Sequence, residues 1–393
     1  MTQTSVDRTA VLPDPSGGPT PYLSPVALVE RIVAHIAAGT TDLGPRTGRV
    51  PVADYTDPAR LAAELEMLRR VPVPFCTSAA LTEPGSFVAR DAAGVPLLAV
   101  RGRAGQVRVF RNACRHRSTA LVEGAGCARS FVCPFHGWVY GLDGALSHVP
   151  DAYGFDGVEL VDRGLAPVPC HERAGLVFVQ QEGEADFSSV EQVPGLTDRH
   201  VLVETERIAV EGNWKVLTEG FLEGYHIRQT HKNTFFPMGY DNLTVLEHSG
   251  RHSRVTFPFR RVEMLGETPP EQWHLGKALT IVDHIFPNAI IARLTAHSAF
   301  VVVEPVSQTS SMLVISKIAL PAEDGSIPEA VHRDISFVET GLLEDRAMAE
   351  GVQRGFAART EDVVFGRYEF ALTQLHEGLA AELEPQRPKN CAL

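Results

Sequence analysis

The sequence predicts an α+β protein in which a small antiparallel β domain precedes a larger mixed domain. From residue 71 to about 181, short β-type runs are interrupted by glycine, a pattern typical of antiparallel sheets. The chain after residue 199 alternates expected strands with helices, and residues 328–356 have the pattern of one long helix. With 393 residues, 44% of them hydrophobic, the chain is long enough for two cores.

The amino-terminal part of the chain is expected to be a tail followed by helices. Residues 1–24 are rich in Pro and Gly, so they bury little apolar surface and are predicted to be flexible. Residues 25–70 are predicted to form an N-terminal helical segment. Apolar residues recur at helical spacing over residues 28–36 and again over 58–70.

The predicted β domain covers residues 71–181. Leu142-Asp143-Gly144 is expected to close a hairpin, because Asp-Gly favours the positive dihedral angles of a tight turn. The expected strands are residues 87–90, 96–101, 107–110, 138–140 and 176–180.

Residues 182–198 are polar with few periodic apolar positions and are predicted to be a linker. The second domain, residues 199–384, is expected to be α+β, and residues 385–393 to be a flexible tail. Its expected elements are a strand at 207–210, a helix at 214–226, strands at 298–304 and 312–320, and the long helix at 328–356.

Composition narrows the classes of function. The formal charge of −12, without a Lys/Arg cluster, argues against a nucleic-acid partner, and no stretch is long and apolar enough for a membrane span. Small molecules and proteins are the expected partners. We expect a cytoplasmic protein, because the cysteines are scattered and no secretory signal is recognisable. Four of the six cysteines are predicted free thiols: Cys76, Cys127, Cys170 and Cys391.

Two Cys-His pairs are the most informative motif in the chain. They are Cys114-x-His116 and Cys133-x-x-His136, each in a short loop-like setting. Two thiolates and two imidazoles are the ligands of a Rieske two-iron two-sulfur cluster, which relays single electrons. A zinc site is the main competitor, but zinc knuckles usually pair Cys with Cys and His with His. A disulfide between the two cysteines would leave both histidines unexplained.

A second constellation lies at residues 219–231. Glu219, Glu223 and His226 are spaced to share one face of the expected helix, while His231 would lie roughly 140° away from His226. The helix must therefore widen or end near Gln229 for both imidazoles to converge. Two His ligands and one carboxylate form the facial triad of non-heme iron sites, which leaves positions open for oxygen and substrate.

The third ligand is expected from a distant part of the chain. Asp345 is our candidate, because it lies on the long helix among apolar residues that could face inward. Glu344 points about 100° away and is expected to be solvated. Asp362 and Glu361 follow the predicted helix end and are weaker candidates.

These motifs together resemble the oxygenase (alpha) subunit of Rieske non-heme iron oxygenases, the ring-hydroxylating and demethylating family. They occur in family order and span well over half of the chain. The matching segments are Asn112-x-Cys114-x-His116-Arg117, Cys133-Pro-Phe-His136-Gly-Trp138-x-Tyr140-x-Leu-Asp-Gly144, Asn213-Trp214-Lys215, Glu223-x-x-His226-x4-His231 and Glu344-Asp345.

The resemblance implies a Rieske domain followed by a helix-grip catalytic domain, with an antiparallel sheet and a long C-terminal helix. It assigns the cluster to Cys114, His116, Cys133 and His136, and the mononuclear iron to His226, His231 and Asp345. It also implies a trimer, which the chain length suggests is a homotrimer. In that trimer, Glu223 would bridge a cluster histidine of one subunit and an iron histidine of its neighbour. Glu at this position resembles members that act on carnitine-like quaternary amines, and Ser118 stands where the family often has Gly.

The resemblance implies a terminal oxygenase that activates O2 and hydroxylates or oxidatively demethylates an aromatic compound or a quaternary amine. The chain has no nucleotide fingerprint, so electrons from NAD(P)H are expected through a separate ferredoxin or flavin reductase. Phe235, Phe236, His284 and Asn288 are candidates for the substrate pocket, with core packing as the alternative for each.

Two other readings of the chain remain open at this point. One is a Rieske electron carrier whose C-terminal half is a non-catalytic interaction domain, although a carrier would not need the second His motif. The other is a catalytically inactive regulatory subunit.

Overall fold

A computed structural model describes residues 21–359 and 361–384 of the chain. The predicted tails at 1–24 and 385–393 lie largely or wholly outside these residues, as does Cys391. The chain divides into two compact units. One unit contains the described parts of residues 1–67 and 205–393, and the other contains residues 68–204. The helical segment at the amino terminus thus belongs with the carboxyl-terminal half.

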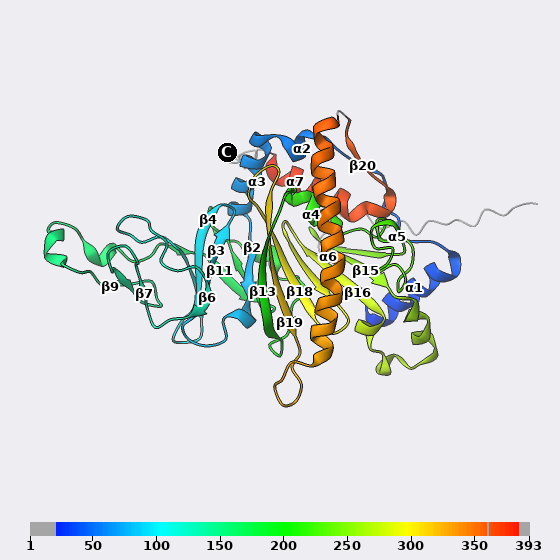
Figure 1. Cartoon of the computed structure of the whole chain (residues 1–393), viewed down its shortest axis with the longest axis horizontal. Helices are drawn as coiled ribbons and strands as arrows, with labels where there is room; N and C mark the ends of the chain where they lie inside the picture. The colour runs from blue at the N-terminus through cyan, green and yellow to red at the C-terminus, as the bar shows by residue number, and fades with distance from the viewer. Residues whose placement is uncertain (1–20, 360, 385–393) are drawn as a thin grey trace, which may run out of the picture. The chain divides into compact units, whose positions relative to one another are not determined.

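Short antiparallel strands build the unit of residues 68–204, as the sequence predicts (Figure 1). They form a five-stranded sheet in the order β10-β5-β4-β3-β6 and two three-stranded sheets, β11-β12-β2 and β7-β8-β9. The strands are β2 (Val73–Thr77), β3 (Ser86–Ala92), β4 (Val95–Arg101), β5 (Val107–Arg111), β6 (Gly124–Cys127), β7 (Phe131–Val132), β8 (Val139–Tyr140), β9 (Leu146–His148), β10 (Pro167–Val168), β11 (Cys170–Arg173) and β12 (Leu176–Val179). The 3-10 helices are η1 (Ser78–Ala80), η2 (Ala152–Phe155), η3 (Leu160–Asp162) and η4 (Ser188–Val190).

The predicted hairpin at 142–144 is confirmed between β8 and β9. Gly144 has φ +81°, and a Cβ there would lie 2.5 Å from the ring of Phe110, so only glycine fits the turn. The Asp143 carboxylate accepts a hydrogen bond from the Ala145 amide at 3.1 Å. This turn packs the loop-bearing sheet onto a core that includes Leu98, Phe110 and Tyr140.

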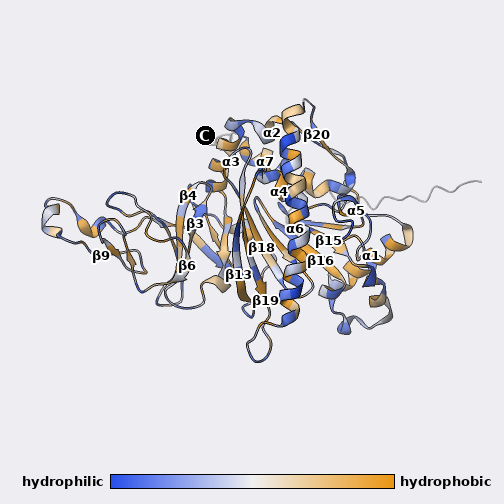
Figure 2. Ribbon diagram, in the orientation of Figure 1, coloured by the Kyte–Doolittle hydropathy of each residue, from blue (hydrophilic) through white to orange (hydrophobic). Residues whose placement is uncertain are grey.

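A seven-stranded sheet organises the other unit. Its order is β13-β19-β18-β17-β16-β15-β14, and β14 through β19 pair antiparallel in succession. Figure 2 colours much of the neighbouring strands β18 and β19 as hydrophobic, and every residue of β18 is buried. The strands are β13 (Val201–Val210), β14 (Val245–Ser249), β15 (His252–Pro258), β16 (Leu279–Ile285), β17 (Ala289–Arg293), β18 (Ser298–Pro305) and β19 (Ser311–Ala319).

The long predicted helix is confirmed as α6 (Glu329–Gly355), which begins after Pro328 and lies across the large sheet (Figure 1). This unit also contains a two-stranded pairing of β1 (Gly48–Val50) with β20 (Val363–Phe365). Its other α-helices are α1 (Pro25–Ala38), α2 (Ala53–Thr56), α3 (Pro58–Arg70), α4 (Trp214–Gly220), α5 (Ile227–Thr230) and α7 (Phe370–Leu383). The 3-10 helices are η5 (Arg260–Glu267), η6 (Pro270–Gln272), η7 (Leu275–Lys277), η8 (Phe356–Ala358) and η9 (Arg367–Glu369).

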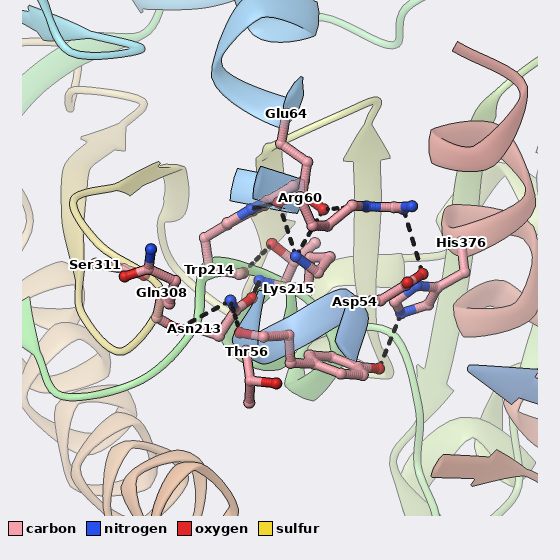
Figure 3. A network of polar contacts seen from close by, with 12 residues as sticks. Asp54, Thr56, Arg60, Glu64, Asn213, Trp214, Lys215, Gln308, Ser311 and His376 are labelled. Carbon is pink, nitrogen blue, oxygen red and sulfur yellow. Dashed lines mark hydrogen bonds and ion pairs between the residues drawn. The ribbon is translucent and has the colours of Figure 1, made fainter. Parts of the chain in front are cut away.

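A buried ion pair joins α3 to α4 (Figure 3). Lys215 Nζ lies 2.8 Å from both carboxylate oxygens of Glu64, and the indole nitrogen of Trp214 donates to the same carboxylate at 2.8 Å. Both charged side chains are almost completely excluded from water, so Lys215 depends on Glu64 for compensation, and Glu64 is also paired with Arg60 at 2.9 Å. The pair fixes the start of α4 and so the chain that leads to residues 223–231.

Candidate metal centres and cavity

The two predicted Cys-His loops have closely similar backbones. The amide of Ser118 donates to the carbonyl of Cys114 at 2.8 Å, and the amide of Gly137 donates to the carbonyl of Cys133 at 3.0 Å. Both cysteines are buried free thiols, 3% exposed. The hydroxyl of Tyr140 accepts from the Arg115 amide at 2.9 Å and lies 3.2 Å from Cys114 Sγ. Two buried sulfurs are thus presented from two matched loops.

The histidines of the same loops meet each other. The rings of His116 and His136 are 4.7 Å apart between centroids, and His116 stacks on Trp138 at 5.0 Å. Nδ1 of His116 is buried and makes no hydrogen bond to the part of the chain that the structure describes. Burial and the neighbouring His136 lower the pKa of His116, which favours the neutral, metal-binding imidazole. A nitrogen without a partner and two buried thiols on the same pair of loops fit the ligand set of a two-iron two-sulfur cluster.

The second constellation also comes together. His231 Nε2 lies 3.2 Å from His226 Nε2 and 2.9 Å from Asp345 Oδ1, and His226 Nε2 lies 3.5 Å from that oxygen. One ligand atom from each of the three side chains lies within 4.8 Å of the others. Two imidazoles and one carboxylate around a common point are the donor set of a facial triad.

The prediction of one helix over residues 214–226 is wrong. The helix α4 ends at Gly220, and the short α5 begins only after His226. Glu219 therefore shares no face with Glu223 and His226. Its Oε1 instead accepts from the Tyr55 hydroxyl at 2.8 Å and lies 2.7 Å from Nε2 of His376. The two imidazoles flank α5, which ends at Thr230, so the predicted ending of the helix near Gln229 is confirmed and no widened helix is needed.

Each imidazole of the triad has a carboxylate on its second nitrogen. Nδ1 of His226 contacts Glu223, and Nδ1 of His231 lies 2.8 Å from Oε2 of Glu344. Glu344 is thus only partly solvated: its side chain is 33% exposed, but it contacts His231 and accepts from the Thr234 hydroxyl at 2.7 Å. Such carboxylates fix the orientation of a ligand imidazole and leave Nε2 for a metal.

Charges at the triad perturb each other strongly. Burial alone would lower the pKa of His226, but hydrogen bonds to Asp345 and Glu223 raise it to about 10. The pKa of His231 is raised in the same way. Burial opposes ionisation of Asp345, yet its bonds to the two histidines lower its pKa. The acidic surroundings thus stabilise positive charge at this point, as a site for a divalent cation requires.

A cavity of about 480 Å³ opens beside the triad and is lined by His226, His231 and Asp345. Of the predicted pocket residues, Phe235 lines it, but Phe236, His284 and Asn288 do not. His284 and Asn288 are buried at the turn end of the β16–β17 hairpin, whereas the cavity meets Thr280, Val282 and Ala292 farther along these strands. The ring of Phe236 lies under the Arg228 guanidinium instead.

Sequence reasoning missed part of the lining. Asp334 lies in the cavity wall beside His297, although no motif singled out this aspartate. Six aromatic side chains also line it: Phe221, Phe235, Tyr240, Phe257, Phe259 and Phe337. Of these, only Phe235 was predicted, because the six come from separate strands, loops and the helix α6.

Comparison with known proteins agrees with this geometry. Residues 71–161 match the family model of the Rieske [2Fe-2S] domain, and residues 197–384 match that of the ring hydroxylating alpha subunit (catalytic domain). The chain belongs to the Rieske oxygenase alpha subunits. This Rieske oxygenase is accordingly an oxidoreductase whose cofactors are a two-iron two-sulfur cluster and a mononuclear non-heme iron.

Curated relatives share part of the sequence. Choline monooxygenase of Beta vulgaris is 27% identical over 341 residues, which cover 81% of this chain and 72% of the relative. The carnitine monooxygenase oxygenase subunit of Escherichia coli (strain K12) is 31% identical over 195 residues, covering 46% and 52%.

Solved structures share the fold of this oxygenase. The quaternary ammonium Rieske monooxygenase CntA in complex with L-carnitine aligns with a TM-score of 0.74 at 17% identity, over 92% of this chain and 100% of that chain. Naphthalene 1,2-dioxygenase from Rhodococcus sp. aligns with a TM-score of 0.70 at 19% identity, over 93% and 100%. Among the described residues, no helix of the oxygenase has the length and apolarity needed to cross a membrane.

Proposed function

We propose that this chain is the terminal oxygenase of a system that oxidises a quaternary amine. A separate ferredoxin or flavin reductase takes electrons from NAD(P)H and passes them to a cluster held by Cys114, His116, Cys133 and His136. The electrons continue to an iron held by His226, His231 and Asp345. Glu223 is the residue through which they enter that site.

The single observation that carries the proposal is the convergence of the triad beside a cavity. The metal supplies the oxygen chemistry when it is bound. The chain orients both imidazoles through Glu223 and Glu344, and its apolar walls exclude water from the reacting groups. An electron carrier would need neither the triad nor the cavity, so the arrangement favours an oxygenase over that alternative.

The cavity and the relatives together favour a quaternary amine. Aromatic faces attract quaternary ammonium groups, and six aromatic side chains line this cavity. The relatives that match the sequence include choline, carnitine and glycine betaine monooxygenases. Oxidation of an N-methyl carbon would release the methyl group as formaldehyde. The mostly apolar wall also suits an aromatic hydrocarbon, which is the second candidate.

The test is oxygen uptake by the holoenzyme with a surrogate reductase and NADH. We expect uptake matched by formaldehyde release, or by hydroxylated product, with choline, carnitine or glycine betaine, and less with naphthalene. Turnover of naphthalene alone would favour the second candidate. Uptake with none of these compounds, despite a reducible cluster, would contradict the proposal.

Variants and metal analysis test the ligand assignment. The proposal predicts three irons and two acid-labile sulfides per chain, whereas a carrier would hold two irons. His226→Ala should abolish product formation and remove one iron while the visible spectrum of the cluster stays. His332→Ala is the matched control, because His332 is exposed on α6. Retained turnover in His226→Ala would exclude the assigned iron site.

A further inference from the structure

The cavity extends along one face of α6, away from the triad. Asp334 and Asp345 both line it and are eleven residues apart on the helix. Eleven residues are three turns with about 20° left over, so both carboxylates face the same way with a rise of about 16 Å between them. The cavity therefore has a metal end at Asp345 and a remote end at Asp334.

A histidine is held at the remote end by that aspartate. Nδ1 of His297 lies 2.8 Å from Oδ2 of Asp334, and the Ala296 amide donates to the same oxygen at 2.8 Å. Burial would raise the pKa of Asp334, but these hydrogen bonds outweigh it and lower that pKa. The hydrogen bond to this carboxylate places the proton of the uncharged imidazole on Nδ1 of His297, and in that tautomer Nε2 is an acceptor. No hydrogen bond within the described residues engages this Nε2.

The cationic residues that line the cavity besides the histidines are Arg261, Lys317 and Arg333, and each is exposed to water or paired with carboxylates. Lys317 lines the cavity, but its ammonium lies 2.7 Å from Glu206 and also contacts Glu339, so two carboxylates share one cation. The side chain of Arg333 is 68% exposed and pairs with Glu329, so water screens its charge. With Asp334 added, this end of the cavity repels a carboxylate and suits a neutral or cationic group.

We propose that His297 determines substrate specificity. Its Nε2 accepts a hydrogen bond from a hydroxyl or N–H group at the end of the substrate remote from the oxidised carbon. Asp334 is a positioning residue that holds the ring and excludes anionic ends. The substrate class is therefore an elongated quaternary ammonium compound with a terminal hydrogen-bond donor and no terminal carboxylate. The ammonium group at the metal end rests on the proposed function.

Three probes that differ only at one end test this. They are hexyltrimethylammonium, (6-hydroxyhexyl)trimethylammonium and (5-carboxypentyl)trimethylammonium, titrated into the holoenzyme by calorimetry. We expect the hydroxyl probe to bind about 10-fold more tightly than the methyl-ended probe, as one hydrogen bond gives, and the carboxylate probe to bind most weakly. Equal affinities, or preference for the carboxylate, would overturn the proposal.

Variants separate this role from a structural one. His297→Leu should remove the preference for the hydroxyl, raising KM for that probe more than it lowers kcat. His297→Gln places an amide near the position of Nε2 and should restore part of the preference. Asp334→Asn keeps an acceptor for Nδ1 but loses the charge, so it should spare hydroxyl binding and relieve the penalty on the carboxylate. A preference that persists in His297→Leu would show that His297 is not its source.

A neutral pair distinguishes the inference from the proposed function. The probes 7,7-dimethyloctan-1-ol and 2,2-dimethyloctane carry tert-butyl in place of trimethylammonium. If no quaternary amine binds but the alcohol still binds more tightly than the alkane in wild type and not in His297→Leu, the proposed function fails while the inference stands. If both pairs show no preference, the inference fails whatever the enzyme oxidises.

Discussion

Ser118 and Gly137 have the same left-handed backbone conformation, with φ values of +63° and +74°, each four residues after one of the two buried cysteines. The amide of each donates to the carbonyl of its cysteine. The positive φ explains why the family often has Gly at the position of Ser118, since an L-residue is strained in this region.

Substitutions at these two turns should therefore have opposite effects on stability. Ser118→Gly relieves strain and should stabilise the folded unit by up to about 1 kcal/mol, whereas Gly137→Ala should destabilise it by about 1–2 kcal/mol. The added Cβ of Gly137→Ala also lies 3.2 Å from Pro150. The midpoint of thermal loss of cluster absorbance in the holoenzyme measures both changes. A lower midpoint for Ser118→Gly would contradict the argument.

Removal of the carboxylate behind His231 should weaken iron binding. Glu344→Ala leaves Nδ1 of His231 without its acceptor, and loss of such a partner typically lowers metal affinity by about 10- to 100-fold. Competition with a chelator, followed by iron analysis, measures this, and cluster absorbance should not change. Glu329→Ala is the control, because that side chain is 83% exposed on the same helix. Equal iron retention in both variants would show that Glu344 does not support the site.

Glu369 should make stability depend on pH. Burial, followed by the charges of Glu223 and Glu219, raises its pKa to about 7 from 4.5. Because the pKa is higher in the folded state, the protonated carboxyl favours folding. This stabilisation is complete below about pH 4.5 and is lost as the pH rises through about 7. Glu369→Gln keeps an acceptor for the Gly366 amide without the charge.

The free energy of unfolding of Glu369→Gln should exceed that of wild type by about 1 kcal/mol at pH 8, allowing for solvent screening, and by little at pH 5. Denaturation at the two pH values measures the difference, with exposed Glu66→Gln as control. A gain that is the same at both pH values would contradict the raised pKa.

The buried pair of Lys215 and Glu64 gives a prediction about stability. Lys215→Met removes the buried cation from the Glu64 carboxylate, which has 0% side-chain exposure and, within the described residues, keeps only the partly exposed Arg60 as an ionic partner, so the change should cost about 3 kcal/mol. Changing both residues, in Lys215→Met with Glu64→Leu, removes the unpaired charge and should recover much of that loss. Chemical denaturation of both single variants and of the double variant tests this. If the loss of unfolding free energy in the double variant equals the sum of the losses in the single variants, the residues act independently.

The local features of this protein were predictable from its sequence. Spacing alone indicated α3 and α6, and Asp143-Gly144 indicated the β8–β9 hairpin, because such signals act between residues a few positions apart. The two Cys-His loops were recognisable for the same reason. The run of short β-type segments interrupted by glycine, followed by mixed strands and helices, also predicted an α+β protein with an antiparallel β domain first.

Tertiary structure decided what depends on residues far apart in the chain. The end of α4 at Gly220 and the contact of Glu344 with His231 could not be read from helical periodicity. His284 and Asn288 are polar residues at plausible positions, yet the length of the β16–β17 hairpin puts them beyond the cavity. The pairing of His297 with Asp334 joins a strand-connecting turn to a helix 37 positions away. Sequence spacing determines which side chains an element carries, whereas packing of whole elements determines which of them meet.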